Sequence, residues 1–110
     1  MEQAALTEAV YYILLSLIEP MHGYGIMQKV EEMSKGRVRL AAGTLYGALN
    51  TLLDKDWIEA LNMQGEDRKK NYKITYLGCN ALHSEMKRLD ELIKNGTMIM
   101  EALGNEKECI

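Results

Sequence analysis

The sequence predicts a mainly helical α+β fold, on three observations. Apolar residues recur three and four positions apart in four separate segments, which is the pattern of amphipathic helices. A short apolar segment and a short alternating segment flank one polar turn, which is typical of a β-hairpin. The chain has 110 residues, of which 47% are hydrophobic and 26% charged, so it can bury a core without disulfides.

The first helix is expected to begin after Thr7, a good N-cap residue that is followed by the acidic Glu8. Pro20 is expected to end it. Its apolar positions at helical spacing are Val10, Ile13, Leu14, Leu17 and Ile18. Its other faces are also apolar, so we expect this helix to be buried on more than one side.

The second helix is expected to follow a turn at residues 21–25 and to be closed by Gly36 as a C-cap residue. Its expected apolar stripe is Tyr24, Met27, Val30 and Met33. In residues 37–40, Val38 and Leu40 alternate with two arginines, which predicts a short strand.

The third helix follows residues 41–44 and carries small or polar residues opposite its core stripe. The expected core positions are Leu45, Leu49, Leu52 and Leu53. A hairpin is expected next, with one strand at residues 57–61, a turn at residues 64–67 and a return strand at residues 72–76.

The last helix is expected over residues 77–94 and is expected to be interrupted just after this range, at Gly96. Its apolar seam has the spacing of a short coiled coil and consists of Leu82, Met86, Leu89 and Ile93. The chain is therefore expected to have two parts. Residues 1–76 hold the first helices and the hairpin, and residues 77–110 form a dimerisation helix with a tail.

Three helices followed by a hairpin is the order of a winged helix-turn-helix domain. In that fold the third helix enters the major groove of double-stranded DNA and the hairpin, or wing, contacts the adjacent backbone. The third helix suits this role because the residues that lead into it are short or polar. The candidate DNA-binding residues on it are Gly43, Thr44, Tyr46, Gly47 and Asn50. The alternative is that Tyr46 is an ordinary half-buried aromatic residue and Asn50 is merely solvated.

The net charge of −3 does not favour nucleic-acid binding, but the basic residues are unevenly distributed. Two short segments hold most of them without any acidic residue. The candidate phosphate contacts in these segments are Lys35, Arg37, Arg39, Arg68, Lys69 and Lys70. An exposed strand rim and a solvated turn are the alternatives for the two segments.

The sequence lacks the residue patterns of an enzyme or a metal site. His22 and His83 are far apart, and no paired-cysteine, His-Glu-x-x-His or phosphate-loop pattern occurs. Cys79 is expected to be a small buried apolar residue, and Cys109 a free thiol. We therefore expect no catalytic residue, no cofactor and no metal. With no transmembrane run and no signal peptide, a cytoplasmic location away from any membrane is expected.

Several sequence motifs occur in a fixed order, at residues 6–10, 21–26, 36–40, 43–49 and 68–75. The most specific are His-Gly-Tyr-Gly, which starts at His22, and Gly-Thr-Leu-Tyr-Gly-Ala-Leu, which starts at Gly43. Over about residues 5–95 the chain resembles the PadR family of bacterial transcriptional regulators. Its short C-terminal region is similar to that of the compact subgroup with one dimerisation helix.

This resemblance implies a homodimeric repressor that binds a pseudo-palindromic operator and is released by a small aromatic or hydrophobic effector. The DNA contacts that it implies are Thr44, Tyr46, Gly47, Arg68 and Lys69. Family members often carry a basic residue just after the Ala-Leu of the third helix, where this chain has Asn50 and Thr51. Sequence preference is therefore expected to differ here.

The first and last helices are expected to form the dimer interface. Its expected residues are Leu6, Val10, Tyr11, Leu14, Leu82, Met86, Leu89 and Ile93. A methionine-lined effector cavity is one hypothesis, with ordinary core filling as the alternative. Its expected residues are Tyr11, Tyr12, Met86 and Met98. The alternative function is a winged-helix module that binds protein rather than DNA, which the acidic net charge would suit.

Overall fold

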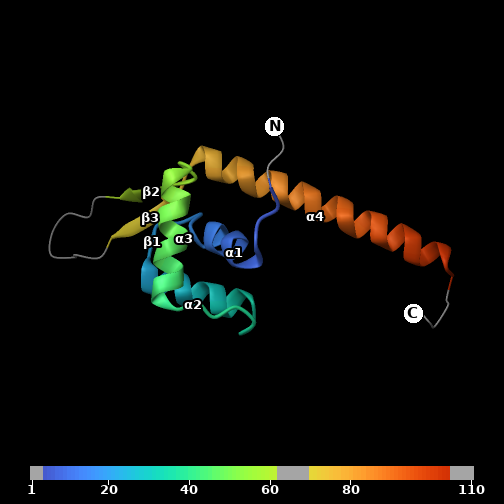
Figure 1. Cartoon of the computed structure of the whole chain (residues 1–110), viewed down its shortest axis with the longest axis horizontal. Coiled ribbons are helices and arrows are strands. Elements are labelled where there is room, and N and C mark those ends of the chain that lie inside the picture. Colours follow the sequence, from blue (N-terminus) through green and yellow to red (C-terminus); the bar gives the residue numbers. More distant parts are fainter. Residues whose placement is uncertain (1–3, 62–69, 105–110) are drawn as a thin grey trace.

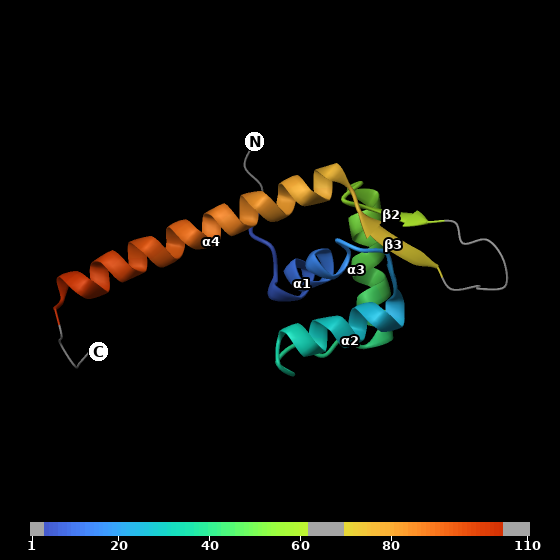
Figure 2. The same cartoon turned by 180° about the vertical axis from the view of Figure 1, so that it is seen from behind.

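The computed structural model describes residues 4–61 and 70–104 (Figure 1). In chain order its elements are α1 (Glu8–Ser16), β1 (Met21–His22), α2 (Gly23–Met33), α3 (Ala42–Asp54), β2 (Ile58–Leu61), β3 (Asn71–Ile74) and α4 (Tyr76–Ala102). The first three helices and the sheet form one body, and α4 starts on that body and extends away from it (Figures 1 and 2). This is the mainly helical winged-helix fold that the sequence predicts.

Side-chain caps set where three of the helices begin. Thr7 caps α1, His22 caps α2 and Thr75 caps α4. Each of these side chains accepts the backbone N–H of the residue three positions on, at 3.0 to 3.1 Å. Such a bond satisfies one of the donors that the first turn of a helix leaves free. The predicted cap at Thr7 is confirmed, but α1 ends at Ser16, before Pro20.

The three strands form an antiparallel sheet in the order β1-β3-β2. The hairpin of β2 and β3 is confirmed, although Tyr76 opens α4 instead of ending the return strand. The turn expected at residues 21–25 is instead β1 followed directly by α2. Met21 lies opposite Tyr72, so β1 joins the hairpin to the start of α2.

Residues 37–40 form a loop, and the strand predicted there is wrong. The hydroxyl of Ser34 accepts the N–H of Val38 at 2.9 Å and donates to the carbonyl of Glu31 at 3.2 Å. These bonds satisfy backbone groups without a neighbouring strand. Val38 and Leu40 are half-buried against the core, so their alternation reflects packing rather than strand pairing.

The core lies between the first three helices and the sheet. Its completely buried large side chains come from all three helices and are Ile13, Leu14, Leu17, Ile26, Val30, Leu45 and Leu49. Of the leucine stripe predicted in the third helix, Leu45, Leu49 and Leu52 are confirmed as buried, and Leu53 is half-buried against the core. In α2 the predicted stripe is wrong at Tyr24, whose side chain is 61% exposed, because Ile26 takes the core position.

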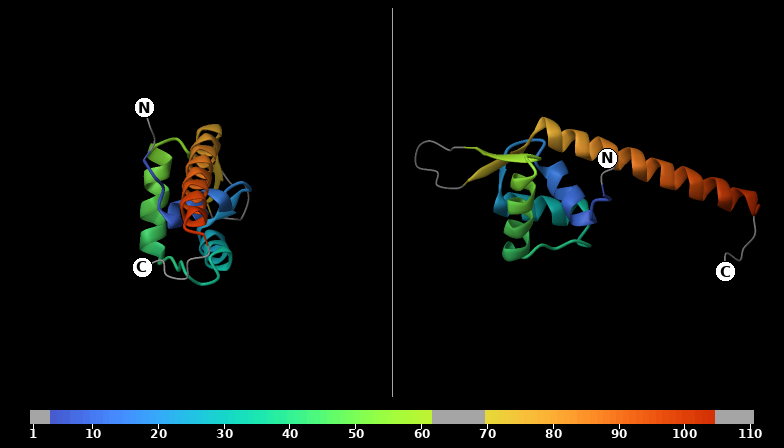
Figure 3. Two further views of the ribbon diagram at one scale, coloured as in Figure 1. Left: turned by 90° about the vertical axis from the view of Figure 1, so that its right-hand side faces the viewer. Right: turned by 45° about the horizontal axis from the view of Figure 1, so that its top comes forward.

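Helix α4 runs without a break from Tyr76 to Ala102, so the interruption predicted at Gly96 is wrong. One glycine costs a helix about 1 kcal/mol, which is not enough to end a long one. The first turns of α4 pack on α1 and β3. Residues 89–102, the projecting part of α4, are all exposed and give the molecule its length of 62 Å (Figure 3). None of the described helices combines the length and apolar character needed to cross a bilayer.

A buried carboxylate ties α4 to the start of the chain. Glu85 is only 3% exposed and accepts hydrogen bonds from Nε and Nη2 of Arg88, at 2.9 and 2.6 Å. The backbone N–H of Leu6 also bonds to this carboxylate. Arg88 holds the pKa of Glu85 below its usual value, against the opposing effect of burial. The ionised carboxylate therefore fixes the N-terminal segment against α4.

Candidate nucleic-acid interface

Helix α3 presents two different faces. Leu45, Leu49 and Leu52 are buried in the core, whereas Thr44, Gly47 and Asn50 are exposed. In Figures 1 and 2, α3 stands beside the hairpin, at the end of the molecule away from the projecting part of α4. The exposed face of α3 and the hairpin therefore belong to one end of the protein, as a recognition helix and a wing do.

Two glycines on this face have open space around them. A Cβ atom added to Gly43 or Gly47 would meet no heavy atom within 4 Å. Packing within the protein therefore does not require glycine at either position. Glycine in a helix interior costs about 1 kcal/mol relative to alanine, so its presence here favours a partner that approaches the helix backbone closely.

The N-terminus of α3 has no side-chain cap, unlike those of the other three described helices. Its N-cap residue is Ala41, and residues 41–44 are all exposed. The N–H groups of the first turn and the positive end of the helix dipole are therefore open to an anion such as a phosphate.

Tyr46 lies against the start of α2. A Cβ atom on Gly23 would be 2.9 Å from Cζ of Tyr46 and closer still to its phenol oxygen. The two most specific sequence motifs therefore meet at this contact, and Gly23 gives Tyr46 the room to pack. Tyr46 is nevertheless 46% exposed, so it both positions α3 on α2 and remains accessible at the surface.

Within the described residues, Lys35 and Lys70, which belong to the two basic segments, do not form one patch. Lys35 follows the C-terminus of α2, where its φ of 54° and the φ of 83° at Gly36 end the helix. Lys70 precedes β3, which pairs with β1 at the N-terminus of the same helix. The 11 residues of α2 therefore separate them, by about 16 Å along the helix axis.

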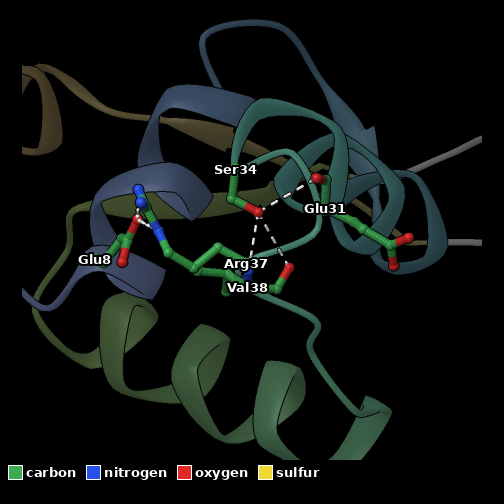
Figure 4. Close-up of polar contacts among 5 residues, drawn as sticks. All are labelled: Glu8, Glu31, Ser34, Arg37 and Val38. Carbon is green, nitrogen blue, oxygen red and sulfur yellow. Dashed lines mark hydrogen bonds and ion pairs between the residues drawn. The ribbon is translucent and has the colours of Figure 1, made fainter.

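Arg37, one of the expected phosphate contacts, has an ion-pair partner within the protein. Its Nε donates to Oε2 of Glu8 at 2.8 Å, and Nη2 donates to the same oxygen (Figure 4). Glu8 raises the pKa of Arg37 through this hydrogen bond. Because its charge is already paired, Arg37 ties the loop before α3 to α1. Arg39 stays exposed, 4.0 Å from Glu31, and remains a candidate beside the N-terminus of α3.

The hairpin offers one described candidate. Lys70 is exposed at the start of β3. Lys73 on the same strand instead donates from Nζ to the carbonyl oxygen of Ile18 at 3.2 Å, which ties the sheet to the end of α1. Arg68 and Lys69, the other expected wing contacts, lie outside the described residues.

Two of the expected dimer-interface residues are wrong. Leu14 and Leu82 are buried in the core of the protomer, so neither can present a surface to a second chain. Met86, Leu89 and Ile93 of the same expected set are exposed on α4. The helical spacing did not show that the first member of the expected seam, Leu82, packs inside one chain.

The expected effector residues do not meet within one chain. Tyr11 and Tyr12 contact each other edge to face on α1, with ring centroids 6.0 Å apart. Met86 and Met98 are exposed on α4, and their separation of twelve positions along the helix places them about 18 Å apart. A cavity shared by all four would therefore need a second chain.

The histidines and the described cysteine have ordinary surroundings. His22 caps α2, His83 is exposed, and Cys79 is a half-buried free thiol that packs against the core. Cys109 lies outside the described residues. Among residues 4–61 and 70–104, no group of three His, Cys, Asp or Glu side chains is placed to hold a metal ion.

A helix-turn-helix of α2 and α3, followed by a hairpin in a three-stranded sheet, defines the winged-helix class of proteins. A family model described as the transcriptional regulator PadR-like family matches residues 13–84. The chain belongs to this family of transcriptional regulators. No curated protein sequence matches the chain significantly.

Solved structures of other regulators share the fold. A transcriptional regulator from Clostridium thermocellum has a TM-score of 0.69 at 19% identity, over 83% of this chain and 87% of that one. A PadR family regulator from Eggerthella lenta has a TM-score of 0.67 at 22% identity, over 84% and 80% of the two chains. A PadR-like transcription factor from Bacteroides fragilis has a TM-score of 0.65 at 28% identity, over 83% and 87%.

Proposed function

We propose that the protein is a homodimeric repressor that binds a pseudo-palindromic DNA operator through α3 and the wing. The observation that carries this proposal is the exposed face of α3, which has short side chains, two unhindered glycines and an uncapped N-terminus. The major groove of B-DNA, about 12 Å wide, admits a helix with such a face. Membership in a family of transcriptional regulators supports DNA as the partner.

Different parts of this surface have different tasks in the proposal. The free N–H groups of Ala42 and Gly43 bind a backbone phosphate, and Arg39 adds a second phosphate contact nearby. Asn50 faces the base edges, where an amide can pair bidentately with adenine. Phosphate contacts fix the register of the helix on the duplex, and base contacts provide the sequence preference.

The wing supplies phosphate contacts on the flank of α3. Among the three basic residues proposed for the wing, the structure describes Lys70, which is exposed. Arg68 and Lys69 are the other two proposed phosphate contacts. Contacts of this kind add affinity that is insensitive to sequence and falls with rising salt.

The proposed dimer forms through α4. Large apolar side chains are exposed along this helix and at its C-cap, namely Met86, Leu89, Leu92, Ile93, Met98, Ile99, Met100 and Leu103. An apolar surface of this extent is typical of a protein–protein interface. A second copy of α4 covers it in the proposed dimer, which also gives the two-fold symmetry that a pseudo-palindromic operator requires.

Release by a small hydrophobic effector completes the proposed mechanism of a cytoplasmic repressor. The methionines of α4 support it, because their flexible side chains form adaptable apolar surfaces. At saturation, an effector that binds the DNA-free dimer more tightly than the DNA-bound dimer lowers operator affinity. The factor is the ratio of the effector's dissociation constants for the DNA-bound and DNA-free dimers.

Fluorescence anisotropy with DNA from the region upstream of its own gene tests the function. We expect the logarithm of the association constant to fall linearly with the logarithm of salt concentration, with a slope of about −4 to −8 per dimer. Asn50→Ala is expected to lose about 1–3 kcal/mol of sequence discrimination. Asn80→Ala, a change at an exposed residue of α4, is the matched control. Absent or salt-independent binding would instead favour a protein-binding module.

A further inference from the structure

A groove runs along the outer face of α2. It has a volume of about 630 Å³, and its lining positions on α2 follow the three- and four-residue spacing of one helix face. The chain after α2 turns back and passes beside this helix on its way to α3, and this loop forms the other wall (Figures 1 and 2). The residues that line the groove are Tyr24, Met27, Gln28, Glu31, Glu32, Gly36 and Leu40.

This groove is separate from the surfaces proposed for the dimer and for DNA. None of its lining residues belongs to α4 or is among the proposed DNA contacts. In Figures 1 and 2, α2 and the start of α4 lie on opposite sides of the body, and α1 contacts both helices. The groove therefore has no role in the proposed function as it stands.

The groove combines an apolar floor with negatively charged groups at one end. Met27 and Leu40 are half-buried and pack against the core, so they form the floor. The ring of Tyr24, which is 61% exposed, lies toward the N-terminal end of α2. The exposed carboxylates of Glu31 and Glu32 lie toward its C-terminal end. A ligand that fits this lining has both apolar and positively charged parts.

The charge of the two carboxylates is largely free for a partner. The Glu31 side chain is 53% exposed and lies 4.0 Å from Arg39, which is long for an ion pair. Glu32 forms no ion pair with any residue that the structure describes. Arginine and lysine suit such a site, because their alkyl stems lie on apolar surface while their charged ends bond to carboxylates. A tyrosine ring adds a cation–π contact.

The position of the groove indicates which kind of partner carries this basic segment. Leu40 immediately precedes Ala41, the N-cap residue of α3, so the groove adjoins the helix end that is proposed to bind a phosphate. Carboxylates repel the phosphates of DNA, so DNA itself is not the occupant. A protein bound to the neighbouring stretch of DNA carries basic residues to neutralise phosphates, and its charge is therefore complementary to the groove.

We propose that the groove on α2 binds an amphipathic, arginine- or lysine-rich segment of a second protein. Resting on the proposed DNA-binding function, this partner occupies DNA next to the operator. Arg39 links the two events, because its turning from Glu31 to a phosphate leaves the carboxylate to the partner.

A labelled peptide tests the groove in the absence of DNA. The probe is a fluorescein-labelled peptide with two central leucines and two arginines on each side. Its anisotropy is expected to rise on titration with the full-length protein and to saturate at one peptide per protomer. The same peptide with serines in place of the leucines keeps the charge and is expected to bind about tenfold more weakly. Equal affinities for the two peptides would overturn the proposal.

Paired substitutions locate the peptide on the protein. Glu31→Gln combined with Glu32→Gln is expected to weaken binding about tenfold, because two charge-assisted hydrogen bonds are lost. Glu91→Gln combined with Glu101→Gln changes the net charge equally at two exposed positions of α4 and is the matched control. Equal losses in the two double variants would mean that the acidic protein attracts the peptide without a defined site, which contradicts the proposal.

The tyrosine at the other end of the groove gives a second, charge-neutral test. Tyr24→Ser is expected to weaken peptide binding about threefold, because the cation–π contact is lost. Tyr76→Ser removes a tyrosine that is 80% exposed on α4 and is the control. Unchanged binding by Tyr24→Ser would place the peptide outside the groove.

The placement of the partner beside the operator has its own readout. At saturating operator DNA, the unmodified protein is expected to bind the peptide more tightly than the Glu31→Gln, Glu32→Gln variant does. Peptide bound by the DNA itself contributes equally to both titrations. If DNA abolished the difference, DNA would cover the groove, which overturns this placement and leaves the peptide site intact. The titration without DNA stands by itself, so a failure of DNA binding is distinguishable from a failure of the groove.

Discussion

At the scale of single residues, two glycines lie in similar helical settings but face different proposed partners. Gly47 of α3 is proposed to face DNA, and Gly96 belongs to the helix proposed to form the dimer. Gly47 of α3 and Gly96 of α4 both have open space where a Cβ atom would lie. Replacing either with alanine is therefore expected to raise the stability of the helix by about 0.5–1 kcal/mol. Only Gly47→Ala is expected to weaken DNA binding, because its methyl group lies on the face that approaches the groove.

Urea denaturation and DNA anisotropy check this pair together. Gly96→Ala is the control for the stabilising effect of the added methyl group. If Gly47→Ala bound DNA as tightly as Gly96→Ala does, then close approach of DNA to that part of α3 would be excluded.

Glu85 is expected to make the free energy of unfolding fall at acidic pH, because its surroundings favour the ionised carboxylate. Its pKa is lowered in the folded protein, mainly by Arg88, from an ordinary value of 4.5. Because the pKa of Glu85 is lower in the folded protein than in the unfolded chain, the ionised carboxylate stabilises the fold at pH values above the unfolded-state pKa. This stabilisation is lost as the pH falls through the folded-state pKa. Glu85→Gln is expected to cost about 1 kcal/mol at pH 7 and to flatten the loss of stability below about pH 4.5.

Chemical denaturation between pH 3 and pH 7, at one protein concentration, measures the effect. Glu91→Gln, a change at an exposed carboxylate on the same helix, is expected to leave the pH profile close to that of the unmodified protein. Identical profiles for Glu85→Gln and the unmodified protein would show that the carboxylate does not hold the N-terminal segment in its charged form.

At the scale of elements, the contact of Gly23 with Tyr46 sets how α2 and α3 pack. A methyl group on Gly23 overlaps the end of the Tyr46 side chain, so Gly23→Ala is expected to cost about 1 kcal/mol and to lower DNA affinity. Tyr46→Ala removes the overlap, so the double variant is expected to be more stable than the sum of the single changes predicts.

The same cycle built with Gly43→Ala is the matched control, because a Cβ atom added to Gly43 would meet no heavy atom of another part of the protein within 4 Å. Its effect on the free energy of unfolding should add to that of Tyr46→Ala. Additivity in the Gly23 cycle as well would mean that the contact does not determine how the two helices pack.

The elements themselves were largely predictable from the sequence, because their apolar spacing matches what the core requires. The leucine stripe of α3 and the cap at Thr7 are local signals, and the structure confirms both. The two-residue strand β1 was missed since its only partner, β3, lies some fifty residues further along the chain. Residues 37–40 were misread because a loop that packs one side against the core can alternate as a strand does.

The candidate site was predictable in part. The exposed residues of α3 follow from the helical period once its core face is known, and all of those predicted on α3 are exposed. The ion pair of Arg37 with Glu8 joins positions 29 residues apart, and charge pattern alone cannot reveal such a tertiary contact. The packing of Tyr46 on Gly23 is also a tertiary contact, so it could not be predicted from the sequence pattern.

At the scale of the whole molecule, α4 would connect two recognition helices in the proposed dimer. The body with α3 lies at one end of the protomer and the projecting part of α4 at the other (Figures 1 and 2). With 27 residues α4 is about 40 Å long, comparable to the 34–36 Å between half-sites one DNA turn apart. Pairing through this helix therefore suits an operator with such spacing.

The projecting part of α4 should consequently determine assembly without affecting the fold of the protomer. Leu89 and Ile93 lie one turn apart, and Ile93 is 69% exposed, so changing both to glutamine removes apolar surface that the single chain does not bury. Light scattering at micromolar concentration is expected to show a dimer for the unmodified protein and a monomer for this variant. Glu91→Gln, on the same turns of the helix, is expected to remain dimeric.

The monomeric variant also separates assembly from DNA recognition. Each α3 remains intact in it, so its affinity for a single half-site should match that of the unmodified protein. Affinity for the complete operator should fall by about a hundredfold or more, because the second half-site no longer benefits from the high effective concentration within a dimer. If the glutamine variant stayed dimeric, or if it lost half-site binding too, α4 would not be an independent dimerisation element.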